Sequence, residues 1–200
     1  MTEVSPDLVR RLGFESVFRL PQTDFAGASS SRVPALDTEA EMARLTPEQR
    51  DRVYNVATRR LAFQILYQLD AAAIKGDIAP VLRDELARVS ELGPIAAEKC
   101  AALVTGAWAN RSQSDADFTG LAPQWPAHRQ PGVDRAILRL AHHEISKGIT
   151  PPRIAINEAV ELARAFSTEK SPSFINALLD KVAAKTAPAP APDAPTAAST

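Results

Sequence analysis

Three helix-length segments follow one another almost without spare loop between residues 133 and 183, and this succession constrains the fold more than any other feature. The segments read VDRAILRLAHHEI, IAINEAVELARAF and SPSFINALLDKVA, and a short break containing Pro151 and Pro152 separates the first two. Apolar residues recur in each segment at the three- and four-residue spacing of a buried helix face. This half of the chain therefore predicts consecutive packed helices.

The first half of the chain carries helix start signals of the same kind. Thr46, Pro47 and Gln49 form the pattern of a capping box with proline in the first turn, which predicts a helix from here to about Leu69. Two further helical patterns follow over residues 77–92 and 95–111, separated by Gly93 and Pro94.

The remaining boundaries are set by glycine, proline and serine. The Pro- and Asp-rich stretch 115–131 predicts only a short helical piece before Trp125. Gly132 begins the next helix and Gly148 ends it, another helix begins near Arg153, and Ser171-Pro172 opens the last. With six or seven helices and no strand pattern, the predicted fold class is all-α.

Composition and charge divide the chain into three parts. Residues 1–45 contain a Ser-, Gly- and Pro-rich stretch and predict a flexible extension, although 6–20 has the pattern of a short amphipathic helix. Residues 186–200 form a Pro/Ala tail that is expected to be disordered. The folded part is 46–185. The whole chain has a net charge of −1, residues 1–45 carry −2 and residues 186–200 carry −1, so the folded part carries +2. This charge is far from strongly basic.

Several function classes find little support in the sequence. No apolar run approaches the roughly 20 residues of a membrane span, and no secretory signal is visible. The single cysteine, Cys100, lies in an apolar stretch, so we expect it to be a buried packing residue. A single cysteine also fits a cytoplasmic protein. His142 and His143 point about 100° apart on a helix and do not favour one metal. Glu158 and Glu161 suit a solvated helix face as well as catalysis. We therefore expect no enzyme and no cofactor.

A nucleic-acid interpretation begins with cations on the helix that starts at Thr46. Arg52 and Arg59 are seven residues apart on one face, and Arg60 shares a polar stripe with Tyr67. Arginine pairs with phosphates and stacks on bases, and a tyrosine ring adds a stacking surface. By pattern alone, a solvated charged helix face remains the more common explanation.

Four strings, in order, resemble the NusB family of bacterial transcription antitermination factors. RRLAFQILYQLD resembles the opening helix of that family, VDRAILRLAHHEI its fifth, and INEAVELARAF with SPSFINALLDKVA its last two; Trp125 also fits. The resemblance covers residues 46–185 and implies two small helical bundles packed across one another. It further implies binding of BoxA RNA in ribosomal RNA leaders together with the ribosomal protein NusE, and assembly with RNA polymerase and other Nus factors.

The resemblance also implies roles for individual residues. By position, Arg59 falls where the arginine-rich first helix of the family meets RNA, and Lys170 and Phe174 fall in a loop-and-aromatic region that touches RNA. Tyr67 and Asp134 fall on the surface near the protein partner. The recognition implied is of single-stranded RNA through phosphate contacts and base stacking, with no chemistry performed.

Departures from the family keep two alternatives open. Asn55, Val56 and Ala57 stand where the family concentrates arginines, Arg60 stands where an acid is common, and His143 replaces a tyrosine. A helical protein-binding scaffold that has lost RNA binding is one alternative. The other is an RNA-holding module for a separate ribosomal-RNA methyltransferase, because NusB-like domains also occur fused to such enzymes. Some family members self-associate, so a homodimer is also possible.

Overall fold

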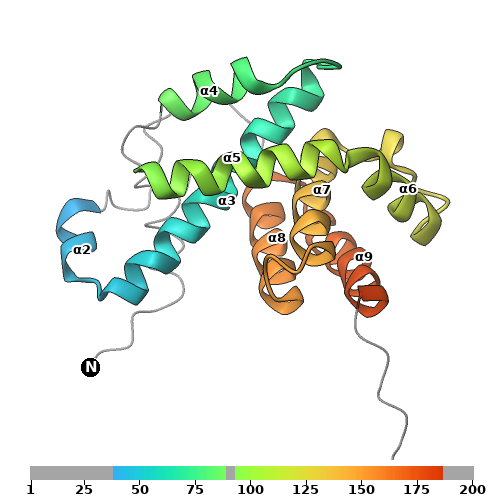
Figure 1. The fold of residues 1–200 in the computed structure, drawn as a ribbon. Helices are drawn as coiled ribbons and strands as arrows, with labels where there is room; N and C mark the ends of the chain where they lie inside the picture. Colours follow the sequence, from blue (N-terminus) through green and yellow to red (C-terminus); the bar gives the residue numbers. More distant parts are fainter. Residues whose placement is uncertain (1–37, 89–92, 187–200) are drawn as a thin grey trace, which may run out of the picture.

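A computed structural model describes residues 38–88 and 93–186, which contain eight α-helices, one 3-10 helix and no strand. The predicted all-α class is confirmed. None of the described helices has the length and hydropathy of a membrane span. The elements, drawn in Figure 1, are α2 (Thr38–Arg44), α3 (Pro47–Ala71), α4 (Ala79–Ala87), α5 (Pro94–Ala109), α6 (Arg111–Leu121), η2 (Ala127–Arg129), α7 (Gly132–Ser146), α8 (Pro152–Phe166) and α9 (Ser171–Thr186).

Most of the predicted helix boundaries are confirmed. At the start of α3 the Thr46 hydroxyl accepts from the Gln49 N–H and the Gln49 side chain accepts from the Thr46 N–H, so the capping box is complete. Gly93 and Gly148 have φ of 76° and 63°, which side chains disfavour, and they flank the start of α5 and the end of α7. Ser171 opens α9 as predicted.

Three helices depart from the prediction. Residues 1–45 were expected to be flexible, yet Thr38–Arg44 form α2; residues 1–37, including the predicted helix over 6–20, lie outside the described residues, as do 187–200 of the predicted tail. The helix expected over 95–111 ends at Ala109, and the side-chain amide of the next residue, Asn110, donates to the Gly106 carbonyl. A separate 11-residue helix, α6, follows where only a short piece was predicted.

The helices form two groups that share α7. Helix α3 packs against α5, while α7, α8 and α9 pack against one another; α7 also contacts α3, α5 and α6 (Figure 1). Apolar side chains from α3, α5, α7, α8 and α9 join in one core. Cys100 lies in it, fully buried as predicted, and burial raises the pKa of its thiol to about 12. This arrangement agrees with two packed helical groups.

A close approach between α5 and α7 depends on Gly106. A Cβ built on Gly106 would lie 2.2 Å from the Nε2 atom of His143, well inside van der Waals contact. The His143 side chain is buried, which together with the nearby charge of Lys147 holds its pKa below the ordinary value of 6.5. The glycine thus leaves room for the imidazole where the two helices meet.

We expect Gly106→Ala to lower the free energy of unfolding by roughly 1–3 kcal/mol, because the new methyl group overpacks the contact with His143. Gly120→Ala is the matched control: nothing lies within 4 Å of that position in α6, and alanine should stabilise the helix by about 0.5 kcal/mol. Urea unfolding of both variants checks this. Equal effects of the two substitutions would contradict the packing described here.

Candidate nucleic-acid and protein interface

The first half of α3 presents Arg52 to solvent but not Arg59. Arg52 is exposed, whereas Arg59 is only 8% exposed. The Arg59 Nε donates to Glu144 Oε1 at 2.9 Å and its Nη2 donates to Thr150 Oγ1 at 3.0 Å; that hydroxyl in turn donates to Glu144 Oε1 at 2.6 Å. In this structure the guanidinium is hydrogen-bonded to the end of α7 and the turn after it, and the expectation that Arg59 contacts RNA stays a prediction.

Arg60 lies on a different side of α3, near the end of α8. Its guanidinium carbon lies 5.0 Å from the ring centroid of Phe166, the last residue of α8. Burial lowers the pKa of Arg60 to about 10, so the side chain remains charged at neutral pH. Arg60 is half-buried.

Asp134 joins the first turn of α7 to the start of α9. The carboxylate is 3% exposed and accepts hydrogen bonds from the Ser171 hydroxyl at 2.8 Å and from the Ser167 hydroxyl. The prediction that Asp134 lies near a protein partner stays a prediction, as does that for Arg59. In this structure Asp134 fixes the turn between α8 and α9. This turn carries Lys170, which is exposed.

The other two predicted residues lie at the same end of α7. Tyr67 is half-buried, and its Cε2 would lie 3.3 Å from a Cβ at Gly132, so the ring covers the helix start. Phe174 is half-buried and packs on the core. We call Tyr67, Lys170 and Phe174 the α7 N-terminal surface. Arg52 is 15 residues before Tyr67, or about 22 Å along the axis of α3.

The α7 N-terminal surface adjoins a hollow of about 640 Å³ between the end of α8 and the start of α9. Its lining mixes one guanidinium, a carboxylate, hydroxyls and an amide with apolar groups, contributed by Val160, Arg164, Ser167, Thr168, Glu169, Pro172, Ser173 and Asn176. Such a lining offers both donors and acceptors, and its charges are mixed. The hollow by itself therefore does not favour an anionic ligand over a neutral one.

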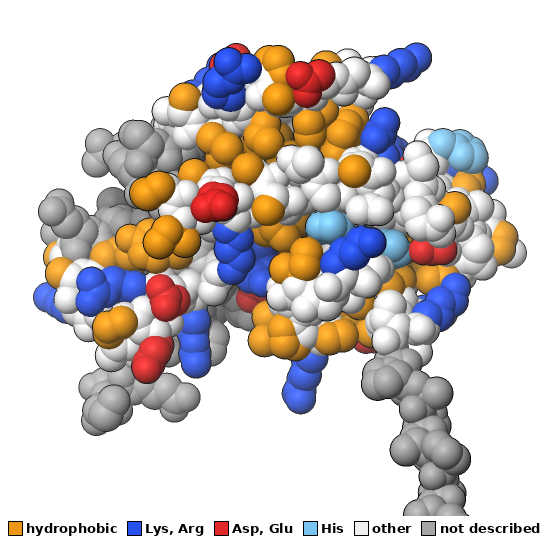
Figure 2. All heavy atoms as spheres, viewed as in Figure 1, with side chains coloured by type: hydrophobic (Ala, Val, Ile, Leu, Met, Phe, Trp, Pro, Cys, Tyr) orange, Lys and Arg blue, Asp and Glu red, His pale blue; other side chains and the backbone are white. Residues whose placement is uncertain are grey.

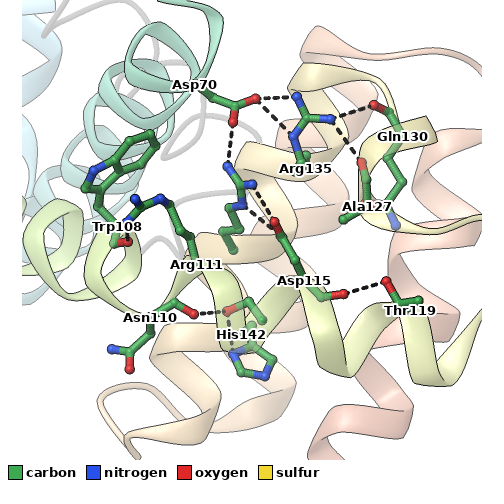
Figure 3. A network of polar contacts seen from close by, with 12 residues as sticks. Asp70, Trp108, Asn110, Arg111, Asp115, Thr119, Ala127, Gln130, Arg135 and His142 are labelled. Carbon is green, nitrogen blue, oxygen red and sulfur yellow. Dashed lines mark hydrogen bonds and ion pairs between the residues drawn. The ribbon is translucent and has the colours of Figure 1, made fainter. Parts of the chain in front are cut away.

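An ion-pair network holds α3, α6 and α7 together at this end of the molecule (Figure 3). Asp70 accepts from Arg135 and from Arg139 (2.7 Å), and Arg139 also forms a two-bond pair with Asp115 at 2.6 and 2.9 Å. Burial by itself would raise the pKa of Asp70, but hydrogen bonds and charge from the two arginines outweigh it and lower that pKa. This network was not predicted from the sequence, in which its visible signal is a pair of arginines four residues apart, Arg135 and Arg139, on an apolar helix.

The side chains of the consecutive residues His142, His143 and Glu144 contact three different helices. His142 forms hydrogen bonds to the Ser114 hydroxyl and the Asp117 carboxylate, both at 2.9 Å, while His143 packs on α5 and Glu144 pairs with Arg59. Among the described residues, no group of three His, Cys, Asp or Glu side chains is arranged to hold a metal. These side chains link α7 to α6, α5 and α3.

The fold and these contacts define an all-helical protein whose two groups of helices share one central helix. A sequence model of the NusB family matches residues 56–184. Proteins named transcription antitermination protein NusB are 42% identical over 127 residues in Geobacter sulfurreducens (62% of this chain, 90% of the relative) and 39% over 134 residues in Herpetosiphon aurantiacus (64% and 88%). The chain belongs to the NusB family.

Solved structures agree with this assignment. T. maritima NusB superposes with a TM-score of 0.56 and 27% identity, over 66% of this chain and 92% of that one. The fold also matches a chain in a crystal structure of the antitermination factors NusB and NusE in complex with double-stranded RNA, with a TM-score of 0.59, 21% identity and coverage of 66% and 97%. At that identity the second likeness supports the fold alone.

We expect Arg59→Leu to destabilise the fold by about 3 kcal/mol, because it leaves the buried carboxylate of Glu144 without its cation. The double variant Arg59→Leu/Glu144→Leu should recover a large part of that loss, since no unpaired charge remains. Arg88→Leu is the control, because its ion pair with Glu85 is exposed and should contribute under about 1 kcal/mol. Additive losses in the double variant, measured by urea unfolding, would argue against a buried pair.

Proposed function

We propose that this protein is a transcription antitermination factor that binds BoxA RNA together with NusE and joins RNA polymerase and other Nus factors. The observation that carries the proposal is the family match across residues 56–184, with relatives named for antitermination. A NusB chain of the same fold occurs with NusE and RNA in a solved complex, and we extend those partners to this chain because it belongs to the same family. The protein acts by binding, without a covalent step.

The exposed cations and rings suggest how single-stranded RNA is held. Lys170 and Arg52 are solvent-exposed and suit phosphate contacts, while Tyr67 and Phe174 offer partly exposed ring surface for unstacked bases. The separation of about 22 Å along α3 between Arg52 and Tyr67 suits a strand of several nucleotides rather than a single contact. RNA thus follows the molecule from the α7 N-terminal surface toward the start of α3.

Weak overall charge makes the partner important, and on the face drawn in Figure 2 basic and acidic side chains lie interspersed. Residues 46–185 carry a net charge of only +2, and Arg59, one of the cations expected to meet RNA, is buried in an ion pair. Phosphate contacts provide most of the salt-dependent attraction for RNA, so few of them means modest affinity for the chain alone. We therefore infer that NusE contributes a substantial part of the RNA-binding surface.

A helical scaffold that binds protein but not RNA is the second candidate. The burial of Arg59 and the presence of Asn55, Val56 and Ala57 on the preceding turns favour it, because together they leave little positive charge on this part of α3. The two functions differ in one measurable property, which is specific affinity for RNA in the presence of NusE. The alternative of an RNA-holding module for a methyltransferase would instead be marked by capture of that enzyme from lysate.

Fluorescence anisotropy of a labelled BoxA RNA, titrated with the protein alone and with NusE, tests the proposal. We expect binding that tightens with NusE and exceeds binding to a scrambled RNA. Arg52→Gln and Lys170→Gln should each weaken binding and reduce the slope of log affinity against log salt by about one.

The matched controls are Arg83→Gln on α4 and Lys75→Gln in the loop before it, which remove exposed cations distant in sequence from both contacts. They should leave affinity and salt slope unchanged. Absence of RNA binding with NusE present would exclude the proposed function and leave the scaffold. If all four charge variants weakened binding equally, the attraction would be diffuse rather than localised.

A further inference from the structure

Trp125 lies exposed on the segment that joins α6 to α7. Trp125 is 42% exposed, whereas Trp108, the other tryptophan of the chain, is 7% exposed. The guanidinium of Arg129 lies 5.2 Å from the centroid of the Trp125 rings, in a cation–π arrangement. His128 beside it is also exposed. An indole and a cation therefore meet at the surface on a single short segment.

This segment is held in place from within the molecule. Arg135 donates through Nη1 to the carbonyls of Ala127 and Gln130, both at 3.0 Å (Figure 3). Gln130 in turn donates through Nε2 to the Trp125 carbonyl at 3.1 Å. Arg135 is in turn fixed by Asp70. Because the backbone around the indole is already ordered, little conformational entropy is lost when a ligand stacks on it.

The charge of the segment suits an anion. Residues 122–133, APQWPAHRQPGV, contain an arginine and a histidine and no acidic residue. The residues exposed beside the indole are polar, cationic or proline rather than a continuous aliphatic patch. A planar ring with a cation next to it matches an unpaired nucleobase and its phosphate better than it matches the apolar anchor of a protein partner.

We propose that Trp125 and Arg129 form a stacking site for one unpaired RNA base, with Arg129 and His128 near the adjoining phosphate. The proposal rests on the RNA-binding function proposed above and adds a contact outside the α7 N-terminal surface. The two places are continuous: Gln130 and Pro131 lead directly into Gly132, on which Tyr67 packs. An RNA strand that crosses the start of α7 reaches the indole without leaving the surface.

Intrinsic fluorescence reports stacking directly, because each tryptophan can be made the only one. In Trp108→Phe, Trp125 is the sole indole, and we expect BoxA RNA in the presence of tryptophan-free NusE to quench its emission saturably. In Trp125→Phe, Trp108 is the sole indole, and we expect RNA to leave its emission nearly unchanged, because that ring is buried. The phenylalanine variants should both retain RNA binding by anisotropy, since a ring remains at each position.

Affinity gives the second measurement. Trp125→Ala should weaken RNA binding by roughly 5- to 150-fold, the effect of losing one stacked base. Arg129→Gln should weaken binding and lower the salt slope by about one. The thermal unfolding midpoint of each variant, compared with wild type, separates loss of the contact from loss of the fold.

The outcomes distinguish this site from the function on which it rests. Wild-type binding with no quenching in Trp108→Phe and no loss in a folded Trp125→Ala would overturn the stacking site and leave the proposed function intact. A different result would assign the indole to the protein partner instead. In that case Trp125→Ala would lose NusE binding measured without RNA, while its affinity for RNA measured without NusE would equal that of the wild type. Failure of the wild type to bind RNA at all would overturn both.

Discussion

The carboxylate of Asp70 is the point on which the relative placement of α3, α6 and α7 depends. It receives both Arg135 and Arg139, and Arg139 extends the connection to Asp115 on α6. Removing partly buried charges from water is unfavourable, and the network offsets this with charged hydrogen bonds on several sides. The lowered pKa of Asp70 reflects that balance. Arg135 also donates to the carbonyls of Ala127 and Gln130, in and just after η2. Through Arg135, the Asp70 carboxylate therefore also fixes this surface segment, the η2 segment.

Polar side chains at both ends of α7 serve similar purposes. Asp134 ties its first turn to Ser167 and Ser171, and Glu144 ties its last turn to Arg59 and Thr150. The central helix thus carries ionisable groups on several faces, yet these are mostly buried and engaged with other helices. Its sequence looks amphipathic and partly charged, but in the fold it is an interior helix whose charges are internal connections. What faces solvent around α7 comes from its neighbours.

Helix positions were predictable because their signals are local. Thr46 with Gln49, Gly148, and Ser171 with its following proline each fix a boundary through atoms a few residues away. Helix α6 was not, because only Ser114 and Phe118 are buried in it and no apolar periodicity marks it.

The roles of Arg59 and Asp134 could not be read from local patterns either. Arg59 meets a carboxylate 85 residues later, and Asp134 meets a hydroxyl 37 residues later. A family resemblance places a residue in the fold, but whether its side chain points to RNA or to another helix depends on partners that lie far away in the sequence.

Under the proposed function, a protein with nearly balanced charge has to hold RNA through shape and order more than through electrostatic attraction. Few phosphate contacts give little long-range steering, so each contact must form without a large cost in flexibility. The buried connections supply that order. They fix the turn that carries Lys170, the ring of Tyr67 lies on the backbone of α7, and the η2 segment is held by Arg135. Arg59, Arg135 and Arg139 form ion pairs inside the protein instead of adding positive charge to its surface. These pairs hold the surface residues in place, and the proposed partner, NusE, would supply the positive charge that RNA binding needs.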